Sequence, residues 1–88
     1  MKKIFVAKAG GRVRKMLDVY SDGERYRLSF LILDRTNPTK EEKAQGAKEK
    51  RFEVLNEEKF IACNDCIDPD QFPLPELMQQ FIDWRNKQ

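Results

Sequence analysis

The chain has 88 residues, of which 40% are apolar and 36% are charged, a composition typical of one small, highly charged globular domain. It contains no histidine, which excludes the commonest general base, imidazole metal ligands and every nucleophile that depends on a histidine. The longest apolar run, Leu28 to Leu33 with Ser29 inside it, is too short to cross a membrane. We therefore expect a single domain over residues 1–88 that has no membrane partner.

The net charge of +2 is distributed unevenly along the chain. Residues 1–51 hold 14 Lys and Arg against 7 Asp and Glu, a balance of +7, whereas residues 52–88 have a balance of −5. The basic half is consistent with a polyanionic partner, and the acidic half with a surface that turns away from that partner or meets a basic protein. Solvation of a small fold explains the same charges.

The N-terminal segment, Lys2 to Ala9, alternates weakly in polarity and fits a short strand better than a helix. Its basic opening resembles a signal peptide, but Lys8 interrupts the apolar part after four residues. We therefore expect the first strand of a cytoplasmic protein, followed by a turn or bulge at Gly10-Gly11.

The segment from Arg12 to Asp34 predicts two antiparallel strands, around which the remaining elements are organised. Asp22-Gly23 lies between alternating apolar runs and is a strong hairpin signal, because a type I′ turn needs positive φ at both central residues. Closing this turn pairs Ser21 with Glu24 and fixes the register. One face of the hairpin is then apolar, with the pairs Val19–Tyr26, Leu17–Leu28, Lys15–Phe30 and Val13–Ile32.

The opposite face of the predicted hairpin is basic. In this register it carries Arg12 at the margin and the pairs Arg14–Leu31, Met16–Ser29, Asp18–Arg27 and Tyr20–Arg25. Guanidinium groups on paired strands can follow a phosphate backbone, and Tyr20 offers a plane on which a base can stack. The candidate nucleic-acid-binding residues are therefore Arg12, Arg14, Tyr20, Arg25 and Arg27. Cross-strand ion pairing on a solvated face explains the same residues.

Residues 37–50 are strongly charged and carry no aromatic or branched apolar side chain. Thr39 and Glu42 have the form of a capping box, which would begin a short polar helix. Only Ala44 and Ala47 would be available to bury, so packing would stabilise that helix little. We favour a mobile charged loop over residues 37–50.

Residues 51–55 return to strand character, whereas residues 56–67 fit two structures. The spacing of their apolar residues suits a helix, yet Lys59 to Cys63 also reads as a short buried strand after a turn at Asn56-Glu57. We favour the strand. The prolines that follow predict extended or turning backbone.

Apolar residues near the C-terminus recur at the spacing of one helix face: Leu74, Leu77, Met78, Phe81 and Ile82. The apolar face of the sheet is the only large surface that this helix can cover. The predicted fold is therefore α+β, with four or five antiparallel strands packed against one C-terminal helix. Trp84 lies off the centre of the apolar stripe, and either closes the edge of the core or anchors a protein partner.

Cys63 and Cys66 form the one local motif with chemical meaning. A structural zinc ion needs four ligands, and two thiols would supply them only across the two-fold axis of a dimer. A thioredoxin-like pair would place its first cysteine at a helix N-terminus, which this sequence does not predict. We expect small apolar residues near a chain reversal, with no metal and no cofactor.

Neither serine of the chain lies in a nucleophile motif, and the glycines do not form a phosphate-binding loop, so we do not expect an enzyme. The sequence predicts a small non-catalytic protein that binds single-stranded nucleic acid through the basic face of residues 12–34. A sheet backed by one helix is shared in outline with several single-strand-binding folds. The alternative is a protein-interaction module, an inhibitor or adaptor or a homodimer, using Trp84, the acidic half or a free strand edge.

Overall fold

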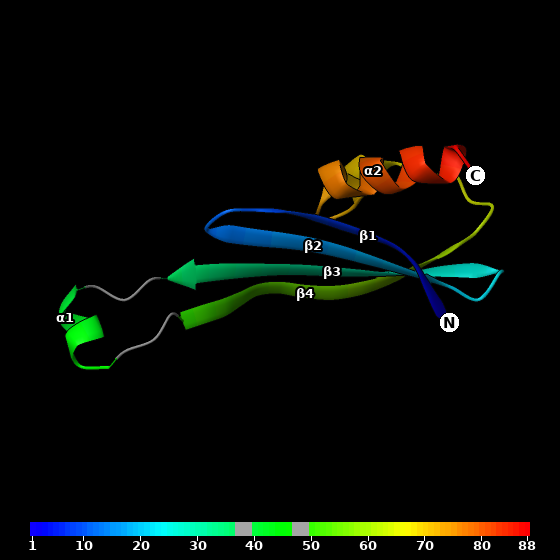
Figure 1. The fold of residues 1–88 in the computed structure, drawn as a ribbon. Helices are drawn as coiled ribbons and strands as arrows, with labels where there is room; N and C mark the ends of the chain where they lie inside the picture. The colour runs from blue at the N-terminus through cyan, green and yellow to red at the C-terminus, as the bar shows by residue number, and fades with distance from the viewer. Residues whose placement is uncertain (37–39, 47–49) are drawn as a thin grey trace.

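The computed structural model describes residues 1–36, 40–46 and 50–88. Its elements, in chain order, are β1 (Lys2–Gly10), β2 (Val13–Ser21), β3 (Arg25–Thr36), α1 (Lys40–Ala44), β4 (Lys50–Ala62), the 3-10 turn η1 (Pro69–Gln71) and α2 (Pro75–Asn86). The strands form one antiparallel sheet in the order β1-β2-β3-β4, and α2 lies against it (Figure 1). The predicted α+β fold, with its C-terminal helix, is confirmed.

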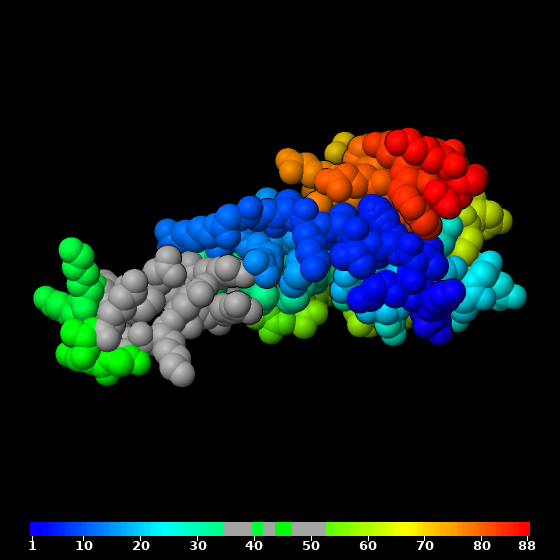
Figure 2. Space-filling model, viewed as in Figure 1, coloured from blue at the N-terminus to red at the C-terminus, as the bar shows by residue number. Residues whose placement is uncertain are grey.

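Helix α2 covers one face of the sheet, over β1 and β2, and we call this the inner face (Figure 1). The helix occupies one end of the elongated sheet (Figure 2). No described element lies on the opposite, outer face. Among the described residues, no helix is both long and apolar enough to cross a bilayer.

The core lies between the inner face and α2. It contains Ala7, Leu17, Val19, Tyr26, Leu28 and Phe30 from the strands, and Leu74, Leu77, Met78 and Phe81 from the helix and the residue before it. Aromatic rings connect the two layers: Phe81 packs edge-to-face on Phe5, with ring centroids 5.6 Å apart, and on Tyr26 at 5.2 Å. Most residues predicted for the apolar hairpin face and for the helix stripe therefore meet in one core, whereas Val13, predicted on that face, is 38% exposed near the far end of the hairpin.

The β2–β3 register differs from the predicted one by two residues. Ser21 pairs with Tyr26 rather than Glu24, and Leu17 pairs with Phe30 rather than Leu28. Because side chains alternate with a period of two, each residue keeps its predicted face although its partner changes. The predicted pairs Asp18–Arg27 and Tyr20–Arg25 are therefore wrong: Tyr20 pairs with Arg27, and Asp18 with Ser29.

Hydrogen bonds at the hairpin tip explain the shift. Oδ1 of Asp22 accepts the backbone N–H groups of Glu24 and Arg25 at 2.9 and 2.8 Å. Asp22 is therefore the first residue of the turn, and Gly23 and Glu24 are its two central residues. Gly23 has φ of 94° and no other residue of the turn has positive φ, which fits a type II′ rather than a type I′ turn. The N–H of Arg25, and then that of Glu24, hold the pKa of the Asp22 carboxyl below its usual value.

Strand β4 is continuous, so the turn expected at Asn56-Glu57 is wrong. Asn56 pairs with Leu31 and Glu57 with Phe30, because β3 is long enough to extend the ladder on both sides of them. The register shifts between Ile32 and Leu33, which leaves Val54 as an extra residue in β4.

The predicted loop at 37–50 lies partly outside the described residues. Within it, Lys40 to Ala44 form the short helix α1, which agrees with the alternative of a polar helix rather than with an irregular loop. Its expected cap, Thr39, lies outside the described residues, and the predicted mobility stays a prediction.

Candidate functional site on the outer face

One row of side chains crosses all four strands on the outer face, near the hairpin tip. Lys3 of β1 pairs with Tyr20 of β2, Tyr20 pairs with Arg27 of β3, and Arg27 pairs with Phe60 of β4. We call Lys3, Tyr20, Arg27 and Phe60 the aromatic-basic row. A bulge at Ile4 places Lys3 in it, because the extra residue lets Lys3 share the face of Val6 and Lys8.

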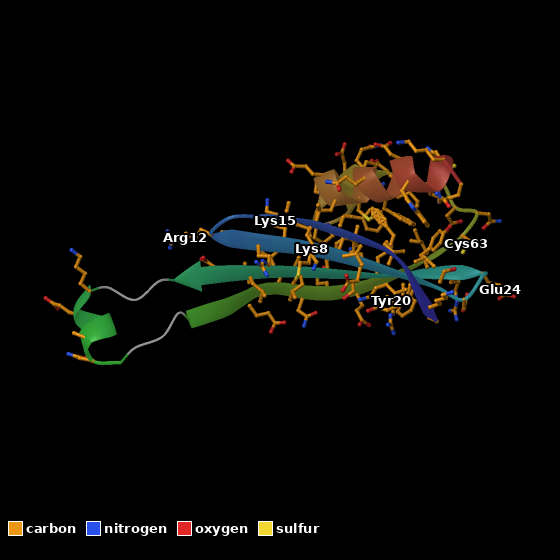
Figure 3. All side chains as sticks on the ribbon, in the orientation of Figure 1. Lys8, Arg12, Lys15, Tyr20, Glu24 and Cys63 are labelled. Carbon is orange, nitrogen blue, oxygen red and sulfur yellow. The ribbon has the colours of Figure 1, made fainter. Side chains whose placement is uncertain are left out.

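Tyr20 lies on the side of the sheet that faces away from α2 (Figure 3). The guanidinium carbon of Arg27 stands 4.3 Å from the centroid of its ring, and Nζ of Lys3 stands 5.5 Å away. Both cations are within the range of cation–π attraction. The Arg27 side chain is thereby held against Tyr20, and its Nε is buried without a hydrogen-bond partner among the described residues.

Charges on either side of this row differ in sign. Arg25 lies one outer-face position nearer the hairpin tip, and is exposed. On the other side, the next row holds Asp18 and the exposed Glu58, in register through Ser29. The positive charge of the row therefore continues toward the tip and ends at two carboxylates toward the middle of the sheet.

Arg14 and Arg12, the other two predicted arginines, lie apart from this row. Arg14 is on the outer face, but six residues from Tyr20 along β2, which is about 20 Å at the rise of a strand. It lines a shallow depression of about 510 Å³ beside Lys8 and the turn between β1 and β2. Arg12 lies in that turn, and its Nε is 3.6 Å from Oδ1 of Asp34.

The sequence predicted that the four arginines share one exposed face. The structure places Arg14, Arg25 and Arg27 on that face together with Tyr20, and places Arg12 outside it. The Arg12–Asp34 contact is the only ion pair within 4 Å among the described residues, so Asp18 and Glu58 do not neutralise Arg25 or Arg27 by direct contact.

Sequence reasoning missed Phe60, which is 56% exposed and completes the aromatic-basic row. As a large apolar residue between Lys59 and Cys63, it is predicted to lie in a buried strand or on a helix face. The alternation of β4 contained a usable signal: once Ile61 is placed on the inner face opposite Tyr26, Phe60 must point outward.

Trp84 is half-buried at the edge of the core. Its ring packs edge-to-face on Phe5, with centroids 5.4 Å apart, and is stacked on Phe81 at 6.1 Å. These contacts place it at the core edge, one of the two positions expected from the sequence. A role in partner binding stays a prediction.

Cys63 and Cys66 are both free thiols, the first half-buried and the second exposed. Sγ of Cys63 lies 3.8 Å from Oγ of Ser21, at the end of β4 beside the hairpin. Burial, and then the nearby Cys63, raise the pKa of the Tyr26 phenol above its usual value. No group of three or more Cys, Asp or Glu within the described ranges could hold a metal ion.

Comparison with known proteins identifies no relative. No protein-family model matches the chain, and no curated protein or solved structure does so either. The outer face therefore has to be interpreted from its own chemistry.

Proposed function

We propose that this chain is a non-catalytic protein that binds single-stranded nucleic acid on the outer face of its sheet. The observation that supports the proposal most strongly is the aromatic-basic row, in which Lys3 and Arg27 flank Tyr20 on a face that no described element covers. Cations on a sheet attract the phosphate backbone, and aromatic rings among them receive unstacked bases.

The distribution of charge favours a polyanion over a protein ligand at this position. Lys3, Arg25 and Arg27 form a basic group near the hairpin tip, and none of the three has an ion-pair partner within 4 Å among the described residues. Unpaired surface cations bind phosphates without first breaking a salt bridge. The two free thiols are consistent with the reducing, cytoplasmic setting expected from the sequence.

A second candidate, a protein-interaction module, is favoured by the edge of the sheet. β4 is an edge strand of 13 residues, and two of its apolar side chains, Val54 and Phe60, are 62% and 56% exposed. A partner could add a strand along this edge. Such a complex would depend on backbone hydrogen bonds and would change little with salt.

Salt dependence tests the first proposal. With three cations, Lys3, Arg25 and Arg27, each neutralising one phosphate, the log of affinity for a labelled single strand should fall against log salt with a slope of about −2, from roughly −0.7 per contact. Replacing Arg25→Gln and Arg27→Gln together should reduce the slope by about 1.4. Anisotropy titrations at several salt concentrations measure both values.

The matched control removes the same charge from the helix side of the molecule. Lys15 lies on the inner-face register and Lys87 follows α2. Lys15→Gln with Lys87→Gln should therefore leave the slope within about 0.3 of the original value. No binding at low salt would remove the nucleic-acid proposal in favour of the strand-addition one, and an equal reduction by both double variants would show that the outer face is not the binding surface.

A further inference from the structure

Phe60 and Tyr20 offer two aromatic rings at the same level of the sheet, but the two rings differ in access. Tyr20 is half-buried, with Arg27 at 4.3 Å and Lys3 at 5.5 Å from its centroid, so a base can stack on it only by displacing a cation. Phe60 is 56% exposed, and no described aromatic or cationic group packs on its ring. An incoming base therefore finds an open face at Phe60 and an occupied one at Tyr20.

Tyr20 has a different effect, which it exerts through Arg27. Its ring holds the Arg27 guanidinium on the β2 side of β3, with the guanidinium carbon 4.3 Å from the ring centroid, whereas Phe60 lies on the other side of β3. Neighbouring strands lie about 5 Å apart, so the backbone of Arg27 is one strand spacing from that of Phe60 and the backbone of Tyr20 is two. A guanidinium held over Tyr20 leaves the Phe60 ring open to a base and can pair with a phosphate of the same nucleic-acid strand.

The acidic row sets the direction in which a strand can run. Asp18 and Glu58 border the aromatic-basic row on the side of the sheet centre, and would repel phosphates from a path along the β-strands. Lys3 and Arg27 lie along the row itself, and Arg25 lies on its other side. The favourable path for a polyanion therefore crosses the strands, from β4 toward β1.

We propose that Phe60 is the base-stacking residue of this interface and that Tyr20 is a positioning residue for Arg27, so that a single strand crosses the sheet along the aromatic-basic row. This inference rests on the proposed function and specifies its ligand further. The ligand has to be single-stranded, because a duplex hides the base faces that Phe60 would receive.

Two labelled oligonucleotides of equal length and charge test the assignment, one of thymidines and one of abasic sites. The intact protein should bind the thymidine strand more tightly. Phe60→Ala should weaken binding of that strand by about 5- to 150-fold, the range for one stacked base, and change binding of the abasic strand less than twofold. Phe60→Trp, which keeps an aromatic ring at this position, should keep the preference for the thymidine strand over the abasic strand.

The variants of Tyr20 separate stacking from positioning. Tyr20→Ala should weaken binding of both strands by the same factor, because it releases Arg27, and Tyr20→Phe should bind as the original chain does. Val54→Ala is the control for loss of an exposed apolar side chain from β4, and should alter neither affinity.

Three outcomes would overturn the assignment. If both strands bind equally and Phe60→Ala changes neither affinity, the stacking assignment fails while the proposed function stands. If Tyr20→Ala alone removes the preference for thymidine, Tyr20 is the stacking residue and the roles are reversed. If neither strand binds at low salt, the proposed function and this inference fail together.

Discussion

The inner and outer faces of the sheet are built from alternate residues of the same strands, yet they differ in burial and in charge. Leu28 and Phe30 on the inner face are fully buried, whereas their outer-face neighbour Arg27 lies on a face that no described element covers. The inner face stabilises the fold by excluding water. The outer face leaves cations and aromatic rings in solvent, where they stabilise nothing of comparable size and are available to a ligand.

Because of this difference, neighbouring residues of one β-strand should contribute to different properties, one to stability and the next to binding. A substitution at an inner position should affect folding, and a substitution one residue away should affect binding with little change in folding.

The largest expected effect is on the free energy of unfolding. Leu28 is fully buried on the inner face of β3, and Leu28→Ala should lower the free energy of unfolding by about 2 to 5 kcal/mol, as large-to-small core changes do. Leu31, on the outer face of the same strand, is the matched control. Leu31→Ala removes the same atoms without opening a core cavity, and should cost less than about 1.5 kcal/mol.

Urea denaturation of the two variants measures the difference. Equal losses would contradict the assignment of the faces, because they would mean that Leu31 is as deeply packed as Leu28. A loss near zero for Leu28→Ala would mean that the apolar face is not the one beneath α2.

A smaller effect concerns the buried Tyr26 and depends on pH. Burial, and then Cys63, raise the pKa of Tyr26 above its ordinary value of 10.0. The neutral phenol is thus favoured in the folded state, so this stabilisation is complete below about pH 10 and is lost as the pH rises through the folded-state pKa. Tyr26→Phe should reduce the loss of stability between about pH 8 and pH 10.5.

Urea midpoints of Tyr26→Phe and of the original chain, measured across this pH range, give the comparison. If the two lose stability alike, Tyr26 does not titrate as a buried inner-face group, and the contrast between the faces is weaker than the structure indicates.

The face on which each side chain of β2 and β3 lies could be predicted from the sequence, whereas the register in which the two strands pair could not. Alternation in Leu17 to Tyr20 assigns each side chain to a face regardless of where the turn closes, because a shift of two residues preserves that assignment. The pairing depends on the carboxylate of Asp22, which accepts two backbone N–H groups and moves the tip to Gly23 and Glu24. The Asp-Gly signal does not distinguish these two closures.

Strand β4 was harder to predict because its inner face is not uniformly apolar. Glu57 and Lys59 lie on that face, opposite Phe30 and Leu28, because α2 packs over β1 and β2 rather than over β4. Alternation in polarity therefore breaks down, and the sequence fits a turn at Asn56 or a helix as well as a continuous strand. Because the sequence does not fix the register of β4, it does not show that Phe60 lies on the outer face.

The proposed function is tested most directly by the two tyrosines, because the chain has one on each face. Fluorotyrosine incorporation gives two ¹⁹F resonances, which Tyr20→Phe and Tyr26→Phe assign. On addition of a thymidine oligonucleotide at low salt, the Tyr20 resonance should shift in a saturable way and the Tyr26 resonance should stay in place. A shift of Tyr26 without Tyr20, or no shift of either at saturating oligonucleotide, would contradict binding on the outer face.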